Sequence, residues 1–283
     1  MSFVALKRDI AEGGFNVFEG FKQSYIAKKE KGVVTLAKNA CPHRGFKLKD
    51  CDGYGPIKCQ YHGQRFEWKS ALTHHEFGEF IFAPEFLGAS QVLKDLSEKI
   101  GEQFGEHKQF VKAPFHLWMQ NTADPNHLNS IHKDSFSKLF DGNRPENVYI
   151  SEFESSYTMR IKDEAVERYK KHFDQASDWF FHYLAFPNLS VTSFLDVFYS
   201  IETANPVEGG CEVTTRFFTG KDIKPNKLLN RMALDANIKI LGEDKCLVET
   251  WASGYRYEAD TKWLPGEARI KRYCDEIRAR GLE

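Results

Sequence analysis

Two short segments of this 283-residue chain each carry one cysteine and one histidine at close spacing. They are Cys41-x-His43 and Cys59-x2-His62, and they limit the local fold more than any other feature of the sequence. A thiolate and an imidazole this close in a tight loop can bind one metal centre together. The residues between His43 and Cys59 suffice for a strand or two and a turn. Two facing loops therefore predict a Cys2His2 metal site.

The order of the ligands separates the kinds of metal site that this composition allows. Zinc fingers pair two cysteines first and two histidines afterwards, whereas each loop here offers one of each. This order suits a two-iron cluster in which both cysteines bind one iron and both histidines bind the other. A structural zinc site is the alternative.

The residues around the first four ligands sharpen this prediction. Pro42, Arg44-Gly45 and Tyr61-His62-Gly63 together resemble the ligand loops of Rieske [2Fe-2S] proteins. Phe46 and Tyr61 stand where the Rieske proteins of respiratory chains carry a disulfide pair. The loops therefore resemble the oxygenase type, or the Rieske-type ferredoxins that serve it.

Three neighbouring residues depart from a simple match. Cys51 is out of register for the respiratory-chain disulfide. Oxygenases of this type usually have tryptophan directly after the second His-Gly, where this chain has Gln64, and the nearby Trp68 is not equivalent. We expect this difference to change the packing around the cluster without loss of the cluster.

A second group of polar residues follows at Asn121-x2-Asp124-x2-His127-x4-His132. Two histidines and one carboxylate with open coordination positions form the facial triad of non-haem Fe(II) oxygenases. Because His127 and His132 are five residues apart, a regular helix would place them about 140° apart. We therefore expect the helix to loosen or end near Asn129–Ser130. Asn121 is a candidate for orienting this array.

The third ligand is expected on a long helix near the C-terminal end of the chain. Positions 234, 237, 241, 244, 248, 251 and 255 step by three and four, which puts Asp244 on a mostly apolar helix face. An unpaired carboxylate there is costly, and Fe(II) would neutralise it. The alternative partner is a buried Arg or Lys. Glu243 points about 100° away and is expected to be solvated.

Together these motifs resemble the catalytic α subunit of Rieske non-haem iron oxygenases, also called aromatic-ring-hydroxylating oxygenases, in the order of that family. The resemblance implies an α+β chain with an N-terminal all-β Rieske [2Fe-2S] domain at residues 1–102. It implies a C-terminal START-like helix-grip catalytic domain at residues 103–283. It assigns a [2Fe-2S] cluster to Cys41, His43, Cys59 and His62, and a mononuclear Fe(II) to His127, His132 and Asp244.

The resemblance also gives Asp124 a bridging role. In the family, subunits assemble head to tail as a homotrimer, so that the cluster of one lies beside the iron of the next. The Asp124 carboxylate would then accept hydrogen bonds from His62 of the neighbour and from His127 of its own chain, fixing both tautomers. A local alternative is that Asp124, followed by Pro125, caps a helix; the two roles are compatible.

The pattern of apolar residues predicts a β-rich first part and a mixed second part. Short strands between glycine-rich turns are expected at 33–37, 56–59, 64–68 and 79–83, with a helix at 90–101. Later, helical spacing is found at 115–140, and strands are expected at 151–163, 179–194, 196–206 and 211–220. A long helix is expected from Pro225 to about Tyr255, with a break near Gly242.

Composition limits the partners. A net charge of −1 and a pI of about 6.8 give no bulk charge that would attract nucleic acid or a membrane surface. No apolar run approaches the ~20 residues that span a bilayer, and the N-terminal segment lacks a signal-peptide pattern. We expect a cytoplasmic protein whose six cysteines are ligands or buried thiols. Since no nicotinamide or flavin motif is found, the reductase or ferredoxin is expected to be a separate polypeptide.

The resemblance implies a terminal oxygenase that uses O2 to hydroxylate, dihydroxylate or oxidatively demethylate a small molecule, with electrons from an NAD(P)H-dependent reductase. Aromatic residues offer a pocket for an aromatic ring or a quaternary ammonium group, although about half of them can point inward. The candidates are Phe180, Phe181, Tyr183, Phe186, Phe194, Phe198 and Tyr199, and His116, His172 and His182 are further candidates.

The short interval between His132 and Asp244 favours a compact domain and a homotrimer without a β subunit. Two other functions stay open at this stage. One is a Rieske electron-transfer protein fused to an inactive START-like ligand-binding domain. The other is a zinc-stabilised binding protein without a redox role.

Overall fold

The chain divides into two compact units, Met1–Glu98 and Lys99–Glu283. The division lies a few residues before the expected boundary at 102. Cys51, Trp68 and Tyr255 fall outside the residues that the structure describes. The computed structural model describes residues 3–48, 57–66, 72–83, 90–132, 137–140, 145–254, 262–263 and 266–283.

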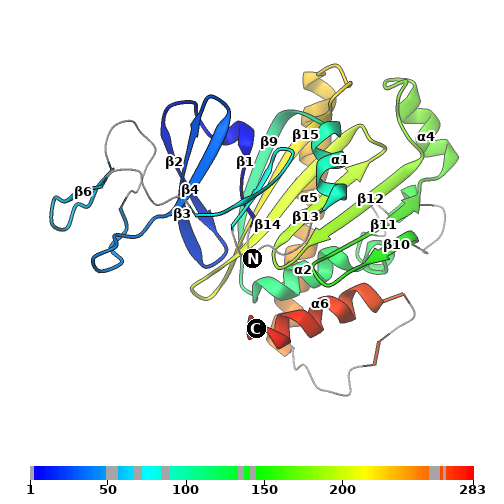
Figure 1. Cartoon of the computed structure of the whole chain (residues 1–283). Coiled ribbons are helices and arrows are strands. Elements are labelled where there is room, and N and C mark those ends of the chain that lie inside the picture. Colours follow the sequence, from blue (N-terminus) through cyan, green and yellow to red (C-terminus); the bar gives the residue numbers. More distant parts are fainter. Residues whose placement is uncertain are drawn as a thin grey trace. The chain divides into compact units, whose positions relative to one another are not determined.

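The first unit is built almost entirely of short antiparallel strands (Figure 1). Its sheets have the orders β1-β8-β7, β2-β3-β4 and β5-β6. The strands are β1 (Phe3–Leu6), β2 (Phe15–Gly20), β3 (Gln23–Glu30), β4 (Val33–Lys38), β5 (Ile57–Lys58), β6 (Arg65–Phe66), β7 (His75–Phe77) and β8 (Phe80–Phe82). A 3-10 turn, η1 (Lys7–Asp9), follows β1, and helix α1 (Gln91–Lys99) follows the strands.

Alternating side chains explain why these strands form a core. Tyr25 and Ala27 on β3, Val34 and Leu36 on β4, and Ile81 on β8 are buried together in one apolar cluster. Their spacing of two residues puts them on one face of each strand. The strands expected from the sequence at 33–37 and 79–83 are thus found at β4 and β8.

The second unit is organised around one antiparallel seven-stranded sheet with the order β10-β11-β12-β13-β14-β15-β9 (Figure 1). Its strands are β9 (Ile100–Val111), β10 (Glu146–Ile150), β11 (Glu154–Arg160), β12 (Trp179–Ala185), β13 (Leu189–Phe194), β14 (Phe198–Val207) and β15 (Gly210–Gly220). The run at 179–194, which was expected as one strand, is a pair, because the chain turns between Ala185 and Leu189.

Helices complete the second unit. They are α2 (Phe115–Ala123), α3 (His127–Ser130), η2 (Ser137–Leu139), α4 (Asp163–Lys170), α5 (Lys227–Gly254) and α6 (Ala268–Ala279). Helix α2 contacts α5, α6 and strands β12 to β15, so it connects the sheet to both C-terminal helices. The mixture of an all-β first unit and a sheet with helices in the second confirms the predicted α+β fold class.

The long helix α5 differs from its prediction in one respect. It continues without interruption through Gly242, so the predicted break there is wrong. A glycine costs about 1 kcal/mol in a helix interior, and burial of one face compensates for it. Leu241, Asp244 and Val248 are buried on that face. Among the described residues, no helix is both long enough and apolar enough to cross a membrane.

Candidate metal centres and substrate cavity

The two Cys/His loops of the first unit have the same backbone geometry. In the first loop, the N–H of Cys41 donates to the carbonyl of Phe46 (2.7 Å), and the N–H of Gly45 donates back to the carbonyl of Cys41 (2.8 Å). In the second loop, Cys59 donates to Gln64 and Gly63 donates to Cys59, both at 2.8 Å. The offsets between donor and acceptor are identical, so the loops present their cysteines in equivalent ways.

The glycines in these loops are required by the backbone. Gly45 has φ of +71° and Gly63 has φ of +69°, a left-handed conformation that glycine adopts without steric cost. The spacing Cys-x3-Gly, found at both sites, is therefore the sequence signature of the turn. The Gln64 side chain is exposed, and its backbone carbonyl closes the second loop, so this contact does not depend on the side chain that replaces tryptophan.

The cysteine and histidine ligands of the loops lie in different surroundings. Cys41 and Cys59 are 4% and 1% exposed and belong to an apolar cluster with Phe15, Ile26 and Leu48 among others. The imidazoles of His43 and His62 are exposed, and their ring centroids are 5.0 Å apart. The thiols thus face the interior of the unit and the imidazoles face outward.

The two cysteines lie close enough for their side chains to interact. Burial opposes ionisation of Cys59, but the backbone N–H groups of Tyr61 and His62 and the thiol of Cys41 lower its pKa, which favours the thiolate that binds iron.

The positions that carry the disulfide in respiratory-chain proteins hold an aromatic pair here. The rings of Phe46 and Tyr61 stack with centroids 5.7 Å apart, and both side chains are exposed. No disulfide is formed among the described cysteines, which are Cys41, Cys59, Cys211, Cys246 and Cys274.

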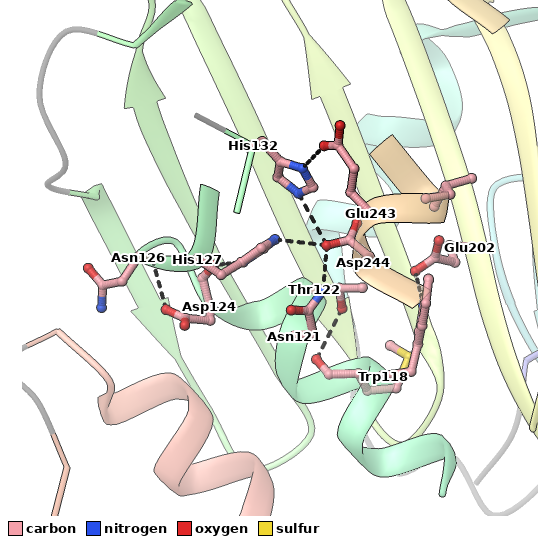
Figure 2. Close-up of polar contacts among 12 residues, drawn as sticks. Trp118, Asn121, Thr122, Asp124, Asn126, His127, His132, Glu202, Glu243 and Asp244 are labelled. Atoms are coloured by element: carbon pink, nitrogen blue, oxygen red, sulfur yellow. Dashed lines mark hydrogen bonds and ion pairs between the residues drawn. The ribbon is translucent and has the colours of Figure 1, made fainter. Parts of the chain in front are cut away.

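In the second unit, three buried side chains converge from two segments that are far apart in sequence (Figure 2). His127 begins helix α3, and His132 follows directly after the helix has ended. The helix ends at Ser130, as the spacing of the two histidines predicted. Asp244 projects from the buried face of α5.

The distances within the triad fit one metal ion. Nε2 of His132 lies 3.1 Å from Oδ1 of Asp244, and Nε2 of His127 lies 3.5 Å from the same oxygen. Metal bonds of about 2.1 Å at angles of roughly 90–110° place ligand atoms roughly 3.0–3.4 Å apart. The chemistry, two imidazoles and one carboxylate, is that of the non-haem Fe(II) facial triad. The structure therefore brings together the three predicted iron ligands, whose role stays a prediction.

The electrostatics of the triad are strongly coupled. Burial opposes ionisation of Asp244, but hydrogen bonds from His127 and His132 hold its pKa well below its usual range. Asn121 on α2 also donates to Oδ1 of Asp244 (2.9 Å), which is an orienting contact of the kind considered for Asn121. The alternative partner, a buried Arg or Lys, is not found among the described contacts of Asp244, so its neutralisation depends on the imidazoles or on a bound cation.

Glu243 was expected to be solvated, and this prediction is wrong. Its Oε2 accepts a hydrogen bond of 2.7 Å from Nδ1 of His132, and its side chain is 28% exposed. Burial opposes protonation of His132, but contacts with Asp244 and Glu243 raise its pKa. The helical spacing gave the direction of Glu243 correctly as different from that of Asp244. It could not show that His132 reaches between the two carboxylates.

Asp124 lies at the C-terminal end of α2. Its carboxylate accepts a hydrogen bond from the N–H of Asn126 (2.8 Å), and its backbone carbonyl contacts Nδ1 of His127. Asp124 is the C-cap residue of α2, whereas Asn126 is the N-cap of α3, so the predicted capping of the following helix by Asp124 is wrong. The contact with His127 is made by the backbone oxygen and not by the carboxylate that was predicted to make it. The bridge to a neighbouring subunit stays a prediction.

A cavity of about 100 Å³ opens beside the triad. The cavity is much larger than the roughly 10–15 Å³ that a single water molecule requires, so it admits a small organic molecule. One side is formed by the sheet and the other by α3 and α5. Its polar lining includes His182, Ser190, Thr192, Ser200, Glu202, Thr215 and Asn237, and its apolar lining includes Leu128, Tyr157, Phe180, Phe217, Ile240 and Leu241.

Of the seven aromatic residues considered from the sequence, Phe180 alone lines this cavity. Tyr157 and Phe217, from neighbouring strands, were not among them. Of the three histidines, His182 lines the cavity, His116 is buried within α2 and His172 is exposed. Sequence reasoning missed Glu202, a buried acid within an otherwise ordinary strand.

The family comparison matches only the first part of the chain. Residues 1–76 match the family model of the Rieske [2Fe-2S] domain. A search of curated proteins finds no match.

Solved structures match over nearly the whole chain at low sequence identity. The quaternary ammonium Rieske monooxygenase CntA in complex with L-carnitine matches with a TM-score of 0.70 and 13% identity, covering 99% of this chain and 88% of that chain. Dicamba monooxygenase bound to 3,6-dichlorosalicylic acid matches with a TM-score of 0.63 and 15% identity, covering 97% of this chain and 94% of that chain. NdmA of Pseudomonas putida CBB5 with caffeine matches with a TM-score of 0.62 and 14% identity, covering 97% of this chain and 88% of that chain.

The matched loops, the buried triad and these likenesses agree with one another. Residues 1–76 match the Rieske [2Fe-2S] domain family, and the chain as a whole shares its fold with the solved Rieske monooxygenases.

Proposed function

We propose that this chain is the terminal oxygenase of a multicomponent Rieske system. It uses O2 to hydroxylate, dihydroxylate or oxidatively demethylate a small organic substrate, with electrons from a separate NAD(P)H-dependent reductase or ferredoxin. The observation that carries the proposal is the buried triad of His127, His132 and Asp244, which borders the cavity. An electron-transfer protein with an inactive binding domain has no use for three converging ligands there.

The residues have distinct proposed roles. Cys41, His43, Cys59 and His62 would hold the [2Fe-2S] cluster, and the triad would hold Fe(II). When bound, these centres supply the electrons and the site for dioxygen chemistry. Asn121 and Glu243 orient Asp244 and His132 through direct hydrogen bonds.

The surroundings of the triad suit this chemistry. The side chain of His132 is fully buried, and the side chains of His127 and Asp244 are 9% exposed. The cavity thus limits the access of water to the reacting atoms and positions a substrate beside the triad.

Asp124 is proposed as the bridge between protomers of a homotrimer. Its support is its position: it directly follows α2, and its backbone carbonyl contacts Nδ1 of His127. The variant Asp124→Asn is expected to keep both metal centres and to lose nearly all turnover. Wild-type turnover in Asp124→Asn would exclude the bridging role. The cytoplasmic location expected from the sequence stays a prediction.

Metal analysis of the purified protein tests the proposed function directly. The oxygenase predicts a red-brown protein with about three irons and about two acid-labile sulfides per chain. About two irons per chain would indicate the electron carrier, and a colourless zinc protein would indicate a structural site.

The substrate class is approached by a turnover screen. Aromatic compounds and quaternary ammonium compounds are incubated with NADH, O2 and a surrogate reductase. The expected result is substrate-dependent consumption of both O2 and NADH, with an oxygenated or demethylated product. Oxygen consumption without product formation for every compound would argue against both substrate classes.

A further inference from the structure

Glu202 is a buried acid in the cavity without a cationic partner among the contacts that the structure describes. It lies on β14, is 5% exposed and lines the cavity. Its Oε1 accepts a hydrogen bond from the indole N–H of Trp118 (2.7 Å) (Figure 2). Its Oε2 accepts one from the hydroxyl of Thr215 (2.9 Å). Both partners are neutral, and a carboxylate has further lone pairs to offer.

The charges around the cavity leave Glu202 uncompensated. No Lys or Arg is found among the described residues that line it. Fe(II) at the triad would carry two positive charges, and Asp244 and Glu243 already balance them. The buried cation Arg269 does not line the cavity. Burial, with a contribution from Asp244, raises the pKa of Glu202 to about 7, which agrees with a missing counter-charge.

A second buried group in the cavity needs a hydrogen-bond acceptor, whereas Glu202 needs a cation. His182 on β12 is 3% exposed, and its Nδ1 lies 3.0 Å from Nη2 of Arg269. A guanidinium can only donate, so Nδ1 is the acceptor and the proton of the neutral ring is on Nε2. Burial and the charge of Arg269 hold the pKa of His182 well below its usual value, so the ring stays neutral.

The Nε2–H of His182 has no acceptor among the described residues, and His182 lines the cavity. Buried donors without an acceptor are rare in folded proteins. This donor is therefore available to an atom with a lone pair in the cavity.

The two groups stand on the same face of the sheet. His182 pairs with Thr192, and Thr192 pairs with Ser200, two residues before Glu202 on β14. Two strand spacings and a two-residue step separate their Cα atoms by roughly 12 Å. A molecule of the size that the cavity admits can therefore meet both.

We propose that the cavity selects a small organic cation that carries an oxygen acceptor, with Glu202 pairing with the ammonium group and the Nε2–H of His182 donating to the oxygen. The aromatic rings of Phe180 and Phe217 complete the site, since ring faces also attract cations. Tyr157 stacks on His182, and the guanidinium of Arg269 already lies over its ring. The inference rests on the proposed function in taking this cavity as the substrate site. It narrows the substrate class and excludes anions as preferred substrates.

Choline and two isosteres test the proposal by equilibrium binding to the iron-loaded protein without O2. In 3,3-dimethylbutan-1-ol, carbon replaces the charged nitrogen; in propyltrimethylammonium, a methyl group replaces the hydroxyl. We expect wild-type protein to bind choline about tenfold or more tightly than the neutral alcohol, because the pair with Glu202 is desolvated. Propyltrimethylammonium should bind several-fold more weakly than choline.

The variant Glu202→Gln keeps the shape of the side chain, and its amide still meets Trp118 and Thr215. It should reduce the preference for choline over the neutral alcohol by about tenfold. The matched control is Glu212→Gln, an exposed glutamate on β15, which removes the same charge and should keep the preference. For the donor, His182→Phe should abolish the advantage of choline over propyltrimethylammonium, and His182→Gln, which retains an N–H donor, should preserve part of it.

Several outcomes would overturn the proposal: no preference of the wild-type protein for choline, no measurable binding of choline, or an unchanged preference in Glu202→Gln. The metal content of the same preparation separates this failure from failure of the proposed function. Protein with about three irons per chain and no preference for choline refutes the recognition pair alone. Protein that lacks the third iron but prefers choline refutes the oxygenase and retains the pair.

Discussion

Replacement of Glu243 by glutamine should weaken the binding of the mononuclear iron without affecting the cluster. Glu243 accepts a charge-assisted hydrogen bond of 2.7 Å from Nδ1 of His132, whose side chain is fully buried. This bond fixes the ring so that Nε2 points toward Asp244, and the carboxylate increases the basicity of the ring. Glutamine retains an acceptor oxygen but loses the charge.

The size of the effect follows from this geometry. Loss of a partner that orients a metal-bound histidine lowers metal affinity by about 10–100-fold. Because the side chain of Glu243 is 28% exposed, solvent screens part of its charge, and we expect a value toward the lower end. A loss of about 20-fold corresponds to about 2 kcal/mol.

The assay is a competition titration of the mononuclear iron against a chelator, followed by metal analysis. The absorbance of the cluster serves as an internal standard for the amount of folded protein. Glu249→Gln is the matched control, since Glu249 lies on the same helix and accepts a hydrogen bond from the N–H of Lys112 (2.8 Å), away from the triad. Equal iron affinity of Glu243→Gln and wild-type protein would refute the orienting role.

Three further predictions concern single groups. Asp244→Ala should retain about two of about three irons and the red colour by metal analysis and absorption spectroscopy; three irons would mean that another carboxylate is the ligand. Because the pKa of Glu202 is about 7, the charged form that pairs with a cation is lost as pH falls, so choline binding measured by calorimetry should weaken roughly tenfold from pH 8 to pH 6. Glu202→Gln should abolish this dependence, and a pH-independent wild-type affinity would contradict it. Arg269→Met should cost about 3 kcal/mol of unfolding free energy in urea, because buried acceptors lose their donor; a change below about 0.5 kcal/mol, as expected for the exposed control Arg160→Met, would show that Arg269 is dispensable.

The geometry of the candidate metal sites could be predicted from the sequence where the relevant contacts are local. The spacing of cysteine, histidine and glycine in the two loops follows from the backbone of a single turn, which residues 41–45 and 59–63 repeat. The end of α3 before His132 follows from helix geometry alone. Asp244 could be identified because a carboxylate on a buried helix face is costly without a cation.

The cavity could not be predicted because its wall reverses the usual pattern. On β12, β13 and β14 the positions that face the cavity include His182, Thr192 and Glu202, whereas apolar residues such as Tyr183, Val191 and Ile201 occupy the opposite face. If the apolar side chains of a strand are assumed to line the cavity, the opposite face of the sheet is selected. A period of two gives the alternation, but it does not show which face is hollow.

Two elements at the margins of the fold were not predicted for related reasons. Strand β9 is the edge strand next to β15, and among its residues only Ile100 and Val111, at its two ends, are buried, so it lacks an extended apolar pattern. Helix α6 buries Ile270, Tyr273, Cys274 and Ile277 at helical spacing, but it buries Arg269 and Glu276 with them, which interrupts the apolar pattern. Polar residues that are buried through specific partners carry no signal in the apolar periodicity of a sequence.

The position of Arg269 gives the last helix an importance beyond its own packing. Its guanidinium donates to the carbonyl of Ala123 (3.1 Å), the last residue of α2, and to Ser155 on β11. Proteolytic removal of α6 would therefore release the segment that leads into Asp124 and His127, and inactivation would precede any visible loss of the sheet. A shortened protein of this kind would keep its red colour while losing oxygen-dependent turnover.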